Sequence, residues 1–297
     1  MGTSYFQIVS DQTGNNLFES KLANRISQKA RVEATVVSDL EKLLEDGEIQ
    51  RALELVNEDD DAWEDLLGFL EGTDESMQRI SFELVAQCGD HPRLLEALPM
   101  LISGLEGDEE DLYRYAAEAM YFLGSDALEA ADSLAALLGY DDDEVRRAVA
   151  RVFAQMGTGA LEAKEALIEA LGDSDEVVRG EVAIALGNIS ADVPEAVPRL
   201  IALLTDEEEF THGDKTLDVR TAAQIALARI GTPAVTSLLE ALRADRADLR
   251  AIALSTLSRI GSLPEGAVKD IEEAVQDPDE TVQAAARKAL KKIKAEK

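Results

Sequence analysis

The stretch VRTAAQIALARIG, residues 219–231, decides the fold because its pattern recurs through most of the chain. Counted from Val219, apolar residues follow at positions three and four, seven and eight, and eleven. This spacing places them on one face of a helix with 3.6 residues per turn. Gly231 stands where helices commonly end, because glycine adopts the left-handed backbone conformation without strain. The stretch therefore predicts an amphipathic helix that ends at a glycine.

Six further stretches share this register. In chain order, the seven stretches begin at Met77, Leu112, Val145, Val178, Val219, Leu249 and Val282. Consecutive first residues are therefore 35, 33, 33, 41, 30 and 33 positions apart. Five of the seven stretches close with glycine, at Gly89, Gly124, Gly157, Gly231 and Gly261. An acidic turn precedes most of them, and another apolar stretch of helical period precedes each turn. The repeating unit is therefore a helix pair of about 33 residues.

Two prolines occupy the same place in this unit. Pro99 ends the string EALP and Pro198 ends EAVP, both inside expected first helices. Proline inside a helix removes a hydrogen bond, so we expect a kink shared by these two helices and a cost in stability.

Pairs of the form LP-x-LI-x-x-L, followed by D-x-D-x-x-VR-x-x-A-x-x-AL-x-x-IG, resemble HEAT repeats. Their short period is most similar to the HEAT-like repeats of the phycobilisome-lyase class. The resemblance covers about residues 61–293. It implies an all-α fold, a right-handed α-α superhelix of about seven helix pairs, in which first helices lie outside and second helices line a concave groove.

We expect three parts in the chain: a mobile or extended N-terminus over residues 1–15, an N-terminal helical cap over 16–60, and a repeat solenoid over 61–297. The helix pairs are expected near residues 61–89, 92–124, 126–157, 160–190, 193–231, 232–261 and 264–294. The lysine-rich end of the last pair indicates a polar C-terminal cap.

The chain is strongly acidic, with 60 acidic and 29 basic residues and a net charge of −31. Residues 51–150 alone hold 26 acidic and 6 basic residues. Such a surface repels nucleic acid and anionic membranes, so we expect neither as a partner. Two explanations stay open. The acidity is either an adaptation to high salt, in a halophilic protein, or a means of recognising a basic partner.

Cysteine content and hydropathy indicate the compartment. The single cysteine, Cys88, has no internal partner for a disulfide. No apolar run approaches the roughly 20 residues of a membrane span, and we find no secretory signal pattern. We expect a cytoplasmic monomer.

Catalytic motifs are missing from the sequence. We find no glycine-rich phosphate loop, no G-x-S-x-G and no H-E-x-x-H. Cys88 and His91 could form a thiol–imidazole pair only in a pocket that lowers the pKa of the thiol, and a structural cysteine is the simpler interpretation. We therefore assign no catalytic residue, metal or cofactor and expect no enzyme. The family resemblance leaves bilin-lyase-like chemistry as an alternative.

A recurring arginine follows the first residue of several second helices. Because packing recurs between repeats whereas a ligand site differs, we interpret this row as a structural ladder that pairs with turn carboxylates such as Asp142 and Asp175. The ladder comprises Arg146, Arg179, Arg220 and Arg250.

Partner-binding residues should instead vary between repeats and face the groove. Aromatic and arginine side chains gather at such positions in the second and third repeats, and these residue types commonly anchor protein interfaces. We predict a groove site formed by Arg114, Tyr121, Phe122, Arg147, Arg151 and Gln155.

The longest spacing contains the stretch TDEEEFTHGDKTLDVR, residues 205–220. We expect a lengthened acidic turn, with Phe210 and His212 forming a secondary contact loop. One histidine among flexible acids holds at most a weak hard cation, so we predict no metal site.

These patterns favour a non-catalytic protein–protein interaction scaffold or adaptor that binds a protein partner in its groove. Besides the scaffold and the bilin-lyase-like enzyme, a third alternative function is an acidic chaperone of a basic protein.

Overall fold

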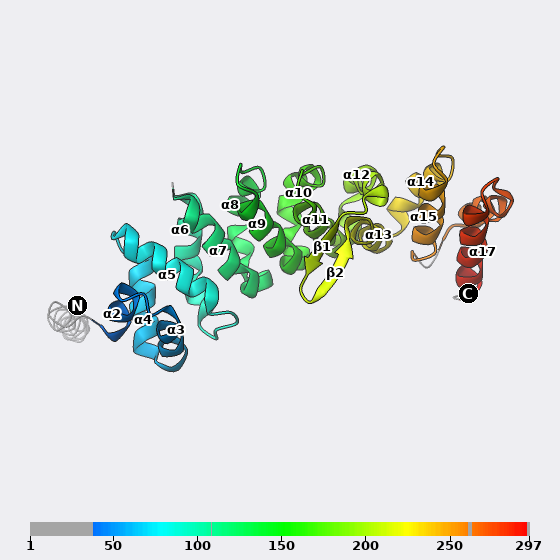
Figure 1. The fold of residues 1–297 in the computed structure, drawn as a ribbon. Coiled ribbons are helices and arrows are strands. Elements are labelled where there is room, and N and C mark those ends of the chain that lie inside the picture. The colour runs from blue at the N-terminus through cyan, green and yellow to red at the C-terminus, as the bar shows by residue number, and fades with distance from the viewer. Residues whose placement is uncertain (1–37, 108, 261–262, 296–297) are drawn as a thin grey trace, which may run out of the picture. The chain divides into compact units, whose positions relative to one another are not determined.

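The computed structural model describes residues 38–107, 109–260 and 263–295 (Figure 1). The expected extended N-terminus, the first part of the helical cap and Gly261 lie outside these residues. The chain divides into two compact units between Leu66 and Leu67, inside helix α4 (Asp60–Leu70). In the first unit, α2 (Asp39–Glu45) packs on α3 (Ile49–Glu58), and Leu40, Leu44 and Val56 are buried.

The second unit is a row of helix pairs, so the expected all-α repeat fold is confirmed. Its first helices are α6 (Leu98–Glu106), α8 (Ala131–Leu137), α10 (Lys164–Ala170), α12 (Val197–Ala202), α14 (Thr232–Ala241) and α16 (Glu265–Glu273). Its second helices are α5 (Glu75–Gln87), α7 (Glu110–Leu123), α9 (Asp143–Met156), α11 (Glu176–Ile189), α13 (Val219–Ile230), α15 (Ala247–Leu257) and α17 (Glu280–Ala295). No helix in the described part of the chain is both long and apolar enough to cross a bilayer.

The second helices form the core by packing on one another along the row, and α7, α9 and α11 lie side by side (Figure 1). Alanine makes this close approach possible. Ala116, Ala150 and Ala183 are fully buried, and a Cβ added at Gly187 would lie 2.8 Å from the Cα of Ala226. The sparse aromatic content is therefore sufficient, because small side chains let neighbouring helices fill the interior without bulky rings.

A residue with positive φ follows five consecutive second helices, and at four of them it is the expected glycine. The backbone φ is +60° at Gly89, +52° at Gly124, +61° at Gly157 and +76° at Gly231. Ser190 takes the same place after α11 with a φ of +73°, and its hydroxyl donates to the carbonyl oxygen of Arg229 at 3.0 Å.

The prolines do not kink helices, contrary to expectation. Pro99 and Pro198 lie in the first turns of α6 and α12, where the missing N–H costs little. A short 3-10 helix precedes each of them: η1 (Leu94–Ala97) and η5 (Pro194–Ala196). The same step occurs without proline before α8 and α10, after η2 (Gly124–Ala130) and η3 (Gly157–Ala163). The shared feature is thus a 3-10 turn that leads into the first helix.

Arginine side chains tie consecutive inter-helix turns together. Nη1 of Arg146 donates to the carbonyl oxygens of Tyr140 and Asp141, at 2.8 and 3.0 Å, in its own turn. Its Nε and Nη2 donate to the carboxylate of Asp173, in the next turn, at 2.8 and 3.1 Å. Its expected partner Asp142 instead caps α9. Each arginine therefore holds two turns, with a nearly buried ion pair between repeats.

Arg179 and Arg250 repeat this geometry. Each donates to two carbonyl oxygens of its own turn and to an aspartate 27 residues further on, Asp206 and Asp277 respectively. In the second repeat, Tyr113 replaces the arginine. Its hydroxyl donates to the carbonyl oxygen of Gly107 at 2.6 Å, and its ring meets Tyr140 edge to face. The connection between turns is therefore kept by aromatic contact where the charges are missing.

Arg220 departs from the pattern. It pairs with Asp218 and Glu207, and the residue 27 positions on is Ala247. Accordingly, α13 and α15 contact each other much less than the other neighbouring second helices do. A buried hydrogen bond joins them, from Nε2 of Gln224 to Oγ1 of Thr256 at 3.3 Å. The repeat array is thus least tightly joined directly after the lengthened turn.

Removal of a ladder arginine should destabilise the fold, whereas removal of an exposed arginine should not. Arg146→Ala removes the guanidinium that neutralises the nearly buried Asp173 carboxylate and serves two carbonyl oxygens, and we expect a loss of roughly 2–3 kcal/mol in the free energy of unfolding. Arg246 pairs with Asp248 in solvent, so Arg246→Ala is the matched control and should leave the Tm nearly unchanged. Urea and thermal unfolding followed by circular dichroism measure both. Equal losses in the two variants would contradict a structural role for the ladder.

Candidate functional site

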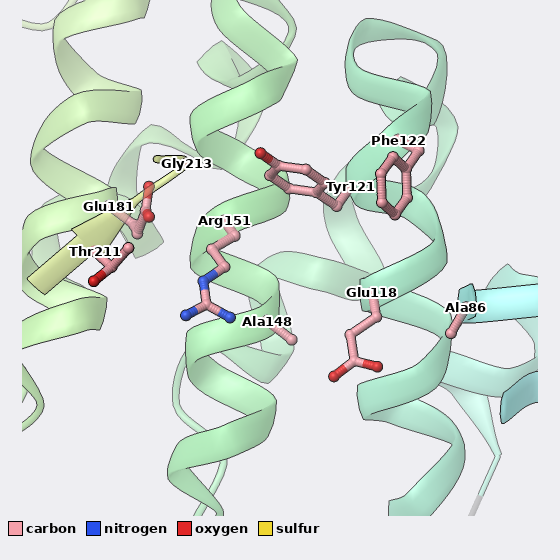
Figure 2. A pocket seen from close by; sticks show the side chains of 9 residues that line it. All are labelled: Ala86, Glu118, Tyr121, Phe122, Ala148, Arg151, Glu181, Thr211 and Gly213. Atoms are coloured by element: carbon pink, nitrogen blue, oxygen red, sulfur yellow. The ribbon is translucent and has the colours of Figure 1, made fainter. Parts of the chain in front are cut away.

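Three of the six predicted groove residues line one hollow of about 400 Å³ on the surface of the second helices (Figure 2). Tyr121 and Phe122 come from the last turn of α7, and Arg151 comes from the middle of α9. The small Ala148, one turn before Arg151 on α9, also lines the hollow, between Arg151 and Glu118 in the view of Figure 2. The other lining residues of the hollow are Ala86, Glu118, Glu181, Thr211 and Gly213.

An exposed aromatic pair forms one end of the hollow. The rings of Tyr121 and Phe122 meet edge to face, with centroids 5.3 Å apart. Phe122 is 47 % exposed, although most large apolar side chains of the protein are buried. Gln155, from α9, donates from Nε2 to the Tyr121 hydroxyl at 3.1 Å and so fixes that ring. The result is an oriented apolar surface that solvent reaches.

The three predicted arginines differ in whether acidic side chains already form ion pairs with them. Arg114 pairs with Glu118 at 3.1 Å and lies over the ring of Tyr115. Arg147 pairs with Asp175 in the next turn, and this hydrogen bond raises the pKa of its guanidinium. Arg151 forms no ion pair within the described part of the chain, and it is exposed. Arg151 is therefore the cation that remains available in the hollow.

A β-hairpin provides the other wall of the hollow. The lengthened turn folds into β1 (Glu209–His212) and β2 (Lys215–Asp218), paired antiparallel with Phe210 opposite Leu217. The connecting residues are Gly213 and Asp214, and Gly213 has a φ of +56°, as the first residue of a type II′ turn requires. The expected irregular loop is thus an ordered element that packs on α11 and α13.

Phe210 attaches the hairpin to α11. Its ring is buried, with 3 % exposed, and lies against Gly180. A Cβ at Gly180 would stand 2.3 Å from Cε1 of this ring, so only glycine leaves room for it. The hairpin residues Thr211 and Gly213 are thereby held against the hollow, whereas the predicted loop residues Phe210 and His212 do not line it.

Glu181 is a site residue that the sequence pattern did not single out. Its carboxylate is almost fully buried, and its Oε2 lies 2.8 Å from Nδ1 of His212. Burial raises the pKa of the Glu181 carboxyl, while His212 and Arg151 act to lower it. The same position holds alanine in both neighbouring repeats, at Ala148 and Ala222. A glutamate in place of this alanine is the feature of the sequence that could have identified Glu181 as a site residue.

The Cys88 thiol is not prepared for nucleophilic chemistry. Burial raises its pKa to about 12, and its Sγ donates to the carbonyl oxygen of Leu84 at 3.3 Å. A thiol in this state stays protonated near neutral pH and is a poor nucleophile. Among the described residues, no cluster of three or more histidine, cysteine or acidic side chains has the geometry to hold a metal ion.

Comparison with known proteins finds a repeat family that matches part of the chain. Residues 131–212 match the family model of HEAT repeats. They contain α8 to α12 and the first hairpin strand, and four of the nine residues that line the hollow. A nearer likeness to phycobilisome-lyase repeats stays a prediction. A search of curated proteins gave no match.

Solved structures share the repeat architecture. A HEAT-like repeats protein from the archaeon Thermococcus onnurineus NA1 is 17 % identical, with 88 % of this chain and 98 % of that chain covered and a TM-score of 0.53. Yeast importin-beta (Kap95p) is 14 % identical over 82 % of this chain and 38 % of its own, with a TM-score of 0.61. A designed armadillo repeat protein in complex with the peptide (KR)4 is 20 % identical, over 77 % and 98 %, with a TM-score of 0.50. At these identities the likeness concerns the fold alone.

The contact between Gly180 and Phe210 predicts an effect that changes sign with its background. Gly180→Ala should lower the Tm, because the new methyl group collides with a buried ring. In a Phe210→Ala background the same change should raise the Tm slightly, since alanine is favoured over glycine inside a helix by about 1 kcal/mol. Thermal unfolding of the wild type, both single variants and the double variant completes the cycle. If Gly180→Ala has one effect in both backgrounds, Phe210 does not anchor the hairpin there.

The raised pKa of Glu181 predicts a pH-dependent difference in stability. Wild-type protein should lose stability as the pH rises through this folded-state pKa, because the buried carboxyl must ionise. Glu181→Gln keeps an acceptor for His212 but does not ionise. The Tm of the variant minus that of the wild type should therefore grow as the pH rises above the ordinary glutamate pKa of about 4.3, where the unfolded chain ionises first. The other carboxyls titrate in both proteins, so their contributions cancel in the difference between the two Tm values. A constant or falling difference would refute the assignment.

Proposed function

We propose that the protein is a non-catalytic scaffold or adaptor that holds a segment of a protein partner in the hollow on its second helices. The observation that carries this proposal is the exposed Phe122 ring in one hollow with an arginine, Arg151, that forms no ion pair within the described residues. Aromatic and arginine side chains in a hollow are the usual anchors of protein interfaces.

The chemistry of the hollow supports a mixed apolar and acidic segment as the ligand. Phe122 and Tyr121 offer apolar contact, and Arg151 offers a charge-assisted hydrogen bond to a carboxylate. Two nearby carboxylates are already engaged: Glu118 by Arg114 and Glu181 by His212. Arg151 is thus the charged residue lining the hollow that forms no ion pair within the described residues.

The repeat architecture supports a protein as the partner. A designed armadillo repeat protein of similar fold was solved in complex with a peptide, (KR)4. A net charge of −31 disfavours nucleic acid and anionic membranes, because like charges repel at long range. We further propose a cytoplasmic monomer, in which the hollow stays open to a partner.

A basic partner is the second candidate, and residues 51–150 favour it through their 26 acidic and 6 basic residues. In that case the protein acts as an acidic chaperone. The two candidates differ in salt dependence. Binding to a diffuse acidic surface weakens steeply as salt screens the charges, whereas burial of an aromatic anchor persists.

The test uses two charge reversals that differ only in position. The protein and its variants Arg151→Glu and Arg259→Glu are immobilised, and captured proteins from native lysate are quantified by mass spectrometry. Arg259 is exposed in the turn after α15, outside the hollow, so its variant controls for net charge. A groove partner should be lost with Arg151→Glu and kept with Arg259→Glu.

The purified partner then gives the magnitude. Phe122→Ala should weaken its Kd at least about tenfold, as truncation of an interface anchor does, without changing the helical circular dichroism. Binding that both charge reversals weaken equally, and that vanishes in high salt, would replace the groove proposal with the acidic chaperone.

A further inference from the structure

Exposed leucines recur at one position of three consecutive repeats. Leu95, Leu128 and Leu161 are 50 %, 47 % and 37 % exposed, and each lies in the 3-10 turn that leads into a first helix. They are 33 residues apart in sequence. Isolated exposed leucines are ordinary on protein surfaces, but recurrence at one structural position of consecutive repeats indicates a shared role.

The three turns belong to adjoining repeats: α7 contacts both η1 and η2, and the first helices α6 and α8 that follow these turns contact each other. Turns η2 and η3 pack on each other, and Cδ1 of Leu128 lies 3.6 Å from where a Cβ of Gly159 in η3 would stand. Other residues fill the interior side of these turns: Ala127 and Ala160, directly before Leu128 and Leu161, are fully buried. The core therefore does not require leucine at the exposed position.

An acidic row runs beside the apolar row. Each leucine is followed by an exposed glutamate: Glu96, Glu129 and Glu162. Glu96 pairs with Arg93, whereas Glu129 and Glu162 form no ion pair within the described residues. We call these three leucines and three glutamates the turn row. Its chemistry is complementary to a surface that alternates apolar and basic side chains.

The distance between leucines of successive repeats indicates which ligand conformation fits the turn row. Packed helices lie about 8–10 Å apart, so successive repeats present a leucine at about that interval. In an α-helix, seven residues rise about 10.5 Å, so a helix with apolar residues at every seventh position matches the row. We propose that the turn row docks a basic amphipathic helix of a partner protein, separately from the groove hollow.

Two synthetic helical peptides test this docking. Both contain the same leucines, lysines and alanines, but one places leucine at every seventh position and the other at every fifth. Binding of each labelled peptide is measured by fluorescence anisotropy at about 0.15 M salt, where charge contacts beyond about 8 Å are screened. We expect the seven-residue peptide to bind at least about tenfold more tightly, because only its leucines keep register with the row.

Protein variants locate the binding surface. Leu128→Ser should weaken binding of the seven-residue peptide about tenfold, and Glu129→Lys should weaken it further in low salt. Phe122→Ala, which is as exposed as Leu128 but lies in the hollow, is the matched control and should not change the affinity. Leu128 is largely exposed, so the variant should keep its circular dichroism. Equal binding of the two peptides, or unchanged binding by Leu128→Ser, would overturn the proposal, and a loss with Phe122→Ala would assign the peptide to the hollow.

Discussion

The repeat array depends on one interaction, in which an arginine side chain forms hydrogen bonds to two consecutive inter-helix turns. A helix pair alone exposes an apolar face, so its stability requires a neighbour in the correct register. Arg146 and Arg179 set that register, because each holds carbonyl oxygens of one turn and a carboxylate of the next. The pairs are nearly buried, and their directional hydrogen bonds add geometric specificity to alanine-rich packing that would otherwise tolerate sliding. Where Arg220 turns back to its own repeat, the packing of α13 on α15 is correspondingly sparse.

The proposed recognition site uses positions that this framework leaves free. The hollow combines an apolar surface from α7, a cation from α9 and a wall supplied by the hairpin, and the buried Glu181 connects that wall to the helices through His212. The ladder side chains point into turns, whereas Phe122 and Arg151 stay accessible. In the proposed function, stability and binding therefore use different residues of the same helices.

Much of the fold follows from the sequence, because register and helix ends depend on local patterns. The apolar spacing after Val145 and the left-handed glycines identify the second helices without any tertiary information. Long-range pairing is less accessible. The sequence indicates that Arg146 is structural, but its partner Asp173 is 27 residues away and competes with nearer acids. Likewise, nothing local reveals that Phe210 fills the space above Gly180, and the burial of Glu181 depends on that same contact.

The hairpin lengthens one turn while α11 and α13 remain closely packed beneath it. A repeat array tolerates such a change because each unit contacts only its neighbours. The turn between α12 and α13 is therefore a natural grafting point. A new segment that preserves an aromatic plug for Gly180 would inherit the position of the hairpin beside the hollow. Specificity could then diverge through one exchangeable turn while the scaffold beneath it stays the same.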